Sequence, residues 1–151
     1  MWSLFNLMKV YVVILLYLLG VNQIEVKSNN EKPKTTLSVN IITDDSSNGF
    51  VYVALHSKSD TFPKKGNEAP YVKRVKISGK KSNVIFSKIP YGTYAISAFY
   101  DENGNGKLDY NILGIPKESA GTSNNYFGFP KWDKSKFELA GSSSTQVIKL
   151  K

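Results

Sequence analysis

The apolar residues after position 35 alternate with polar ones in short runs. The first run is "TLSVNII", in which Leu37, Val39 and Ile41 share one face, and "FVYVALHS" repeats the pattern after an Asn-Gly turn. Alternation with a period of two residues is typical of half-buried β-strands. Further strand candidates are "YVKRVKIS", "NVIFSKI" and "TYAISAFYD", and we expect a final hairpin formed by "KFELA" and "TQVIKL" around "GSSS".

Turn-forming residues separate these runs, and no window past residue 30 has a long helical period. About seven short strands spaced by turns predict an all-β fold, a single Greek-key β-sandwich that covers residues 36–151. The segment from Gly104 to Trp132 lacks the alternation but is too apolar for a disordered chain. We therefore expect a long ordered loop after the Asp101–Asp109 turn, folded back over one end of the sandwich.

Residues 1–20 differ from the rest of the chain. Lys9 precedes an apolar run over 10–19 that Gly20 ends, which is typical of a secretory signal peptide. Because "MWSLFNLM" before Lys9 is also apolar, an uncleaved N-terminal anchor is the alternative. Residues 21–35 are predicted to form a linker. The sequence thus indicates an exported protein that is periplasmic, secreted or held at the outer membrane surface.

Composition excludes several kinds of site and partner. The chain has no cysteine, which rules out disulfides, thiolate catalysis and cysteine zinc sites. Its net charge is +8, but Arg74 is the only arginine among 20 basic residues. Proteins that read nucleic acid favour arginine for its bidentate fork, so we expect no nucleic-acid partner. The sequence does not identify a partner, and a glycan or protein of the envelope or cell surface is one candidate.

The stretch "DENGNGKLD" carries the most specific pattern in the chain. A calcium loop places oxygen ligands at alternate positions around a glycine, as in D-x-[DN]-x-[DN]-G. The ligands at positions 1, 3, 5, 7 (through a main-chain carbonyl) and 9 would be Asp101, Asn103, Asn105, Lys107 and Asp109. Position 12 is Ile112 instead of glutamate, so the loop is no EF-hand. Glu118 is the first candidate for a carboxylate that could complete the shell, followed by Glu102.

A turn without metal is the alternative for the same stretch. Asn103-Gly104 and Asn105-Gly106 are preferred hairpin residues, and Asp and Asn side chains cap their own turns. At this point both hypotheses stand: a hairpin turn, or a Ca²⁺ site with a Kd of about 0.1–1 mM.

We expect no enzyme and no catalytic residues. His56, the single histidine, shares a predicted strand face with Phe50 and Tyr52, which favours a packed or exposed strand residue over a general base. The alternative is a hydrolase of a glycan or acidic polymer that uses clustered carboxylates: Asp101, Glu102, Asp109 and Glu118. Aromatic residues from 126 to 132 could form a sugar- or peptide-stacking surface, but we favour a role in covering the core.

Several motifs follow one another in a fixed order along this chain: Pro90, Gly92, Tyr94 and Ala95; Asp101, Glu102, Asn103, Asn105, Gly106 and Asp109; Gly114, Ile115, Pro116 and Glu118; Gly121, Ser123, Asn124, Asn125 and Pro130. Together with "GFVYVALHSKSDTFP" upstream, they resemble the bacterial family called domain of unknown function 2141. Tyr100 stands where that family often has histidine, which weakens the idea of a histidine metal ligand. The resemblance implies a secreted or periplasmic β-sandwich similar to transthyretin-like and carboxypeptidase regulatory-like domains, and it implies no activity.

Overall fold

The computed structural model divides the chain into two units, Met1–Glu31 and Lys32–Lys151. The residues that the structure describes are 8–9, 11–12, 31–44, 49–63, 68–77, 79–126 and 128–151. In the first unit, 8–9 and 11–12 are helical. The remainder of the predicted signal peptide or anchor, and residues 21–30 of the predicted linker, lie outside the described residues. Within the described ranges, no helix combines the length and the apolar character that a membrane span requires.

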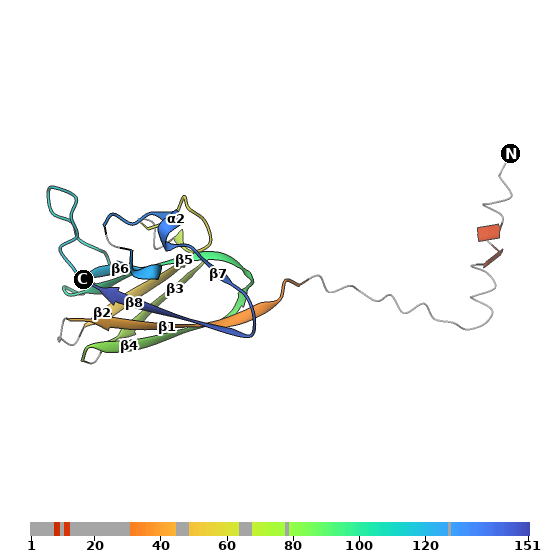
Figure 1. The fold of residues 1–151 in the computed structure, drawn as a ribbon, viewed down its shortest axis with the longest axis horizontal. Helices are drawn as coiled ribbons and strands as arrows, with labels where there is room; N and C mark the ends of the chain where they lie inside the picture. Colours follow the sequence, from red (N-terminus) through yellow and green to blue (C-terminus); the bar gives the residue numbers. More distant parts are fainter. Residues whose placement is uncertain are drawn as a thin grey trace. The chain divides into compact units, whose positions relative to one another are not determined.

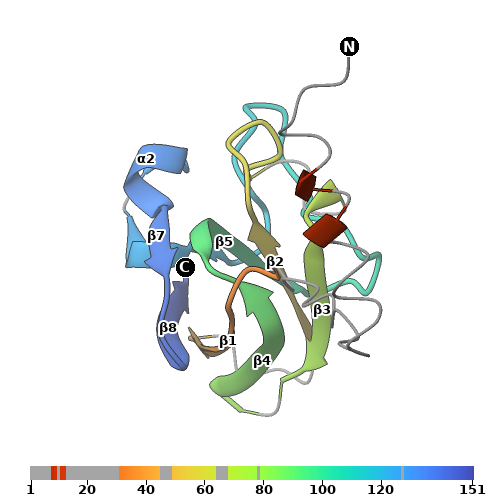
Figure 2. The same cartoon turned by 90° about the vertical axis from the view of Figure 1, so that its right-hand side faces the viewer.

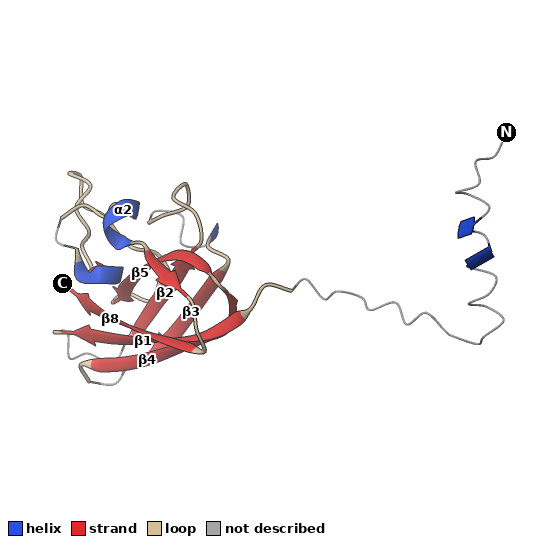
Figure 3. Cartoon of the chain, turned by 45° about the vertical axis from the view of Figure 1, so that its right-hand side comes forward, coloured by secondary structure: helices blue, strands red, loops and turns tan. Residues whose placement is uncertain are grey.

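Two β-sheets pack against each other in the second unit (Figure 2). The first has the order β4-β1-β8, with β1 at Lys34–Thr43, β4 at Lys81–Pro90 and β8 at Ser143–Leu150. The second has the order β3-β2-β5-β6, with β2 at Phe50–His56, β3 at Tyr71–Lys76, β5 at Gly92–Asp101 and β6 at Ala120–Thr122. The short strand β7 (Phe137–Leu139) also pairs with β5. The predicted all-β sandwich is confirmed, with eight described strands against about seven predicted (Figure 3).

The predicted final hairpin is wrong. β7 pairs antiparallel with the start of β5, at Gly92–Tyr94, whereas β8 pairs parallel with β1 in the other sheet. The "GSSS" segment therefore carries the chain from one sheet to the other instead of turning it back. Alternation shows which face of a strand is buried, but it does not show which neighbour the strand pairs with.

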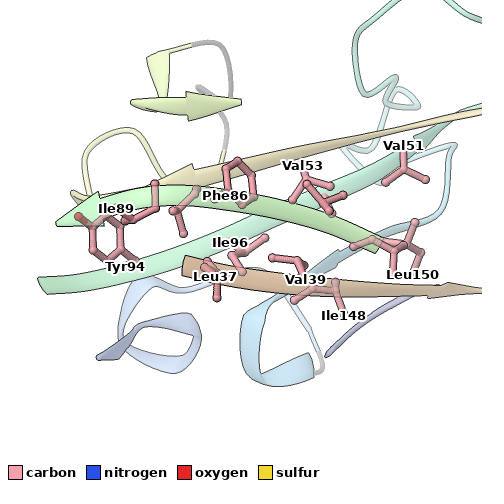
Figure 4. Close-up of a cluster of buried hydrophobic side chains, with 14 of the residues drawn as sticks. Leu37, Val39, Val51, Val53, Phe86, Ile89, Tyr94, Ile96, Ile148 and Leu150 are labelled. Atoms are coloured by element: carbon pink, nitrogen blue, oxygen red, sulfur yellow. The ribbon is translucent and has the colours of Figure 1, made fainter. Parts of the chain in front are cut away.

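The core consists of strand side chains between the two sheets (Figure 4). One of the two alternating faces predicted for β1 and for β2 is buried, and its six residues are at most 1 % exposed: Leu37, Val39, Ile41, Val51, Val53 and Leu55. Each such side chain contributes about 1.5–3 kcal/mol when it is fully buried. Of the members of this core cluster, Ile77 alone lies outside a strand.

The long loop does not cover the end of the sandwich as expected. Ile112, Leu113 and Phe129 are largely exposed, and the teal segment between β5 and β6 projects away from both sheets (Figure 1). The physical reason is that strand residues already fill the space between the sheets. Of the aromatic residues, Trp132 does pack, edge-to-face against Phe62 with ring centroids 6.0 Å apart. Phe127 lies outside the described residues.

The segment Ser123–Asn125 (helix η2) forms hydrogen bonds with three neighbouring elements, β5, β8 and a short helix that follows it. Ser123 Oγ accepts the Ile96 N–H of β5 at 2.9 Å and donates to the Ser135 carbonyl of helix α2 (Trp132–Ser135). Asn124 Nδ2 donates to two carbonyl oxygens at the end of α2, both at 3.1 Å. Asn125 bonds the main chain of β8 as donor at 2.8 Å and as acceptor at 2.7 Å. This motif therefore fixes the C-terminal end of the long loop.

Candidate functional site

The candidate site begins where β5 ends. Asp101 is the last residue of β5, pairs with Phe50 of β2 and is 1 % exposed. Its Oδ2 accepts the Gly106 N–H at 3.0 Å. Its Oδ1 is also buried and has no hydrogen-bond partner among the described residues. A buried carboxylate oxygen without a protein partner is costly, so a water molecule or a cation at this atom would stabilise it.

The predicted ligands converge on one tight turn. Asn103 and Asn105 each donate a side-chain N–H to Asp109 Oδ2, at 2.6 and 2.9 Å. Their amide oxygens accept the main-chain N–H groups of Asn105 and Lys107, at 3.0 and 2.8 Å. Gly104 and Gly106 adopt φ of +77° and +76°, which glycine tolerates without strain. The side chains at positions 1, 3, 5 and 9 thus meet within the turn that they form.

Glu118 returns to this turn. It is 7 % exposed, and its two carboxylate oxygens accept the N–H groups of Glu102 at 3.0 Å and Asp109 at 3.2 Å. The Lys117 N–H donates to the Asp109 carbonyl at 2.8 Å. Glu118 therefore clamps the two ends of the turn through the main chain. Each carboxylate oxygen has further lone pairs, so these two bonds do not prevent Glu118 from binding a cation.

The turn is suited to an oxygen-bound cation more than to acid–base catalysis. No three His, Cys, Asp or Glu side chains form a metal-holding group within the described part of the chain, so a cation would also need amide and carbonyl oxygens. The Asn103 and Asn105 amide oxygens each accept one main-chain N–H and keep a second lone pair that a cation could use. Asp101 and Glu118 are buried, an arrangement that does not favour the hydrolase alternative. That alternative stays a prediction.

Replacing Glu118 with alanine should lower the free energy of unfolding by about 2 kcal/mol, because two main-chain N–H groups lose their charged acceptor. Urea unfolding of the wild type and the variant measures this difference. The matched control is Asp133→Ala, which removes an exposed carboxylate paired with Lys136 and should leave the midpoint unchanged. Equal midpoints for all three proteins would show that Glu118 does not clamp the turn.

A second polar cluster, which the sequence pattern does not reveal, surrounds His56. The ring is fully buried, with Nε2 2.8 Å from Ser97 Oγ and Nδ1 3.2 Å from Thr61 Oγ1. Phe62 packs edge-to-face on it with centroids 5.3 Å apart. Burial lowers the pKa of His56 from 6.5 to about 4. Of the two expected placements, packed or exposed, the structure shows the packed one. Ser97 lies 41 residues from His56, too far in sequence for a local pattern to connect the two.

Comparison with known protein families places most of the chain in one family. The family model described as "Uncharacterized protein conserved in bacteria (DUF2141)" matches residues 39–147. No curated protein and no solved structure matches the chain. The matched range runs from β1 to β8 and includes the whole turn from Asp101 to Glu118. The resemblance found in the sequence motifs is thereby confirmed, and the chain belongs to this bacterial family of uncharacterized proteins.

Proposed function

We propose that the domain is an exported binding or structural module of the bacterial envelope, and that its turn from Asp101 to Glu118 binds one calcium ion weakly. The observation that carries the calcium site is Asp101 Oδ1, a buried carboxylate oxygen without a described hydrogen-bond partner. A divalent cation at this end of the turn would satisfy that oxygen and draw the neighbouring oxygen atoms toward itself.

The ligand set fits calcium better than smaller or softer cations. It consists of oxygens alone: carboxylates of Asp101 and Asp109, amide oxygens of Asn103 and Asn105, and the Lys107 carbonyl, with Glu118 beside them. Calcium accepts six to eight oxygens in flexible geometry, whereas magnesium demands a near-ideal octahedron. The small number of carboxylates predicts a Kd of about 0.1–1 mM, the range of extracellular modules. The apolar run at 10–19 supports export to a compartment where calcium reaches that concentration.

Calcium at about 1 mM should stabilise the domain by about 1.4 kcal/mol if the Kd is about 0.1 mM. Thermal unfolding would then shift upward by about 5 °C. Asp101→Asn should abolish the shift, because asparagine keeps an acceptor for the Gly106 N–H but removes the charge.

Asp133→Asn, an exposed carboxylate in α2, is the control and should shift like the wild type. Magnesium at equal concentration should shift the wild type less than calcium does. A wild-type melting temperature that does not change with calcium would refute the site.

A further inference from the structure

We propose, on the basis of the calcium site above, that residues 110–116 form a finger that inserts into an anionic lipid bilayer when calcium is bound. The finger carries four apolar side chains that are exposed over about half of their surface or more. Their exposed fractions are 102 % for Ile112, 76 % for Leu113, 48 % for Ile115 and 47 % for Tyr110. Exposed apolar side chains gathered on one short segment mark an interaction site.

The finger is already shaped by its own hydrogen bonds. Asn111 Oδ1 accepts the N–H groups of Leu113 and Ile115 at 2.9 and 3.0 Å. The Asn111 N–H donates to the Ile115 carbonyl, and the Gly114 N–H to the Asn111 carbonyl, both at 2.9 Å. Tyr110 and Pro116 pair across the base. Because the main chain is held in this form, insertion requires little further ordering.

The shape and side chains of the finger fit a bilayer. The loop projects from one end of the sandwich, so its tip is convex and can enter a fluid surface without a complementary groove (Figure 1). Aliphatic residues form the tip, Tyr110 lies at the base, and Lys107 and Lys117 flank it in sequence. Aliphatic, aromatic and basic residues in this order are typical of segments that lie in a membrane interface.

Binding of calcium would change the net charge of the segment that carries the finger, and this charge determines whether the finger can approach anionic headgroups. Within 101–118, the two lysines stand against four carboxylates, Asp101, Glu102, Asp109 and Glu118, which leaves a formal charge of −2. A bound Ca²⁺ ion brings that charge to zero and removes the local repulsion from anionic headgroups. The remainder of the chain is basic, with a net charge of +8 overall, and attracts an anionic surface.

The absence of cysteine in the chain permits a local test. Leu113→Cys in the full chain is labelled with an environment-sensitive fluorophore and mixed with phosphatidylglycerol-containing vesicles. With calcium, the emission should shift to the blue and be quenched by spin-labelled acyl chains. Ile85→Cys, at a 50 % exposed site on β4, is the matched control and should show no shift. This readout is local, so attachment through residues 1–20 does not produce it.

Two additional variants make the result decisive. Ile112→Asp in the Leu113-labelled chain should abolish the blue shift, and so should Asp101→Asn or vesicles of phosphatidylcholine alone. A Leu113 probe that stays in water, while calcium still raises the melting temperature, overturns insertion and leaves the calcium site intact. The absence of a melting shift refutes the calcium site itself. A blue shift that occurs without calcium would show that insertion does not depend on calcium. A blue shift that occurs without lipid would show contact between protein chains instead of insertion.

Discussion

Replacing Gly121 with alanine should destabilise the domain by about 3 kcal/mol or more. A Cβ at this position would lie 2.5 Å from the Lys149 carbonyl oxygen and 3.1 Å from Ile148 Cγ2. The first of these contacts is with main chain, which cannot rotate away as a side chain can. Ala120 and Lys151 also exchange two main-chain hydrogen bonds here, both at 3.1 Å. Relief of the clash would separate β6 from β8, where the two sheets meet.

Urea unfolding measures the effect, and Gly92→Ala is the control. At Gly92 the added Cβ would meet the Tyr94 ring at 3.5 Å, which is an ordinary contact. Its free energy of unfolding should stay within about 0.5 kcal/mol of the wild type. If both variants unfold at the same urea concentration, the close approach of β6 to the main chain of β8 does not exist.

Stability should fall by up to about 3 kcal/mol as the pH is lowered from 6.5 to 4, because His56 is buried as the neutral ring. Burial lowers the pKa of His56 to about 4, whereas the unfolded chain takes up the proton near 6.5. Between these values the unfolded state binds more protons than the folded state. The stabilisation is therefore complete above pH 6.5 and is lost as the pH falls toward 4.

The single histidine makes this measurement direct. One imidazole resonance, followed by NMR in the folded protein, should titrate near pH 4. In His56→Leu, the slope of stability against pH should be smaller between pH 4 and 6.5, while the contribution of the carboxylates is retained. A folded-state titration near 6.5, or equal slopes in both proteins, would mean that burial does not hold the ring neutral.

Much of the fold was predictable from local pattern. The inward faces of β1 and β2 follow from alternation, because one face of each strand must be removed from water. The convergence of Asp101, Asn103, Asn105 and Asp109 also followed from spacing, since glycines and Asx side chains build such a turn from neighbouring residues. Gly121 and Ser123–Asn125 were recognisable from the sequence as motif residues. Their roles could not be predicted, because the close contact of Gly121 and the hydrogen bonds of Ser123–Asn125 involve segments distant in sequence.

The sequence by itself determined the all-β class, the buried strand faces and the Asp101–Asp109 turn, because each depends on residues close together in the chain. Tertiary structure alone decided that β7 pairs with β5, that β8 pairs parallel with β1, and that Phe62 packs against the ring of His56. It also decided that Ile112 and Leu113 point away from the core. An apolar side chain is buried only where the packed sheets leave space for it, and a local pattern does not contain that information.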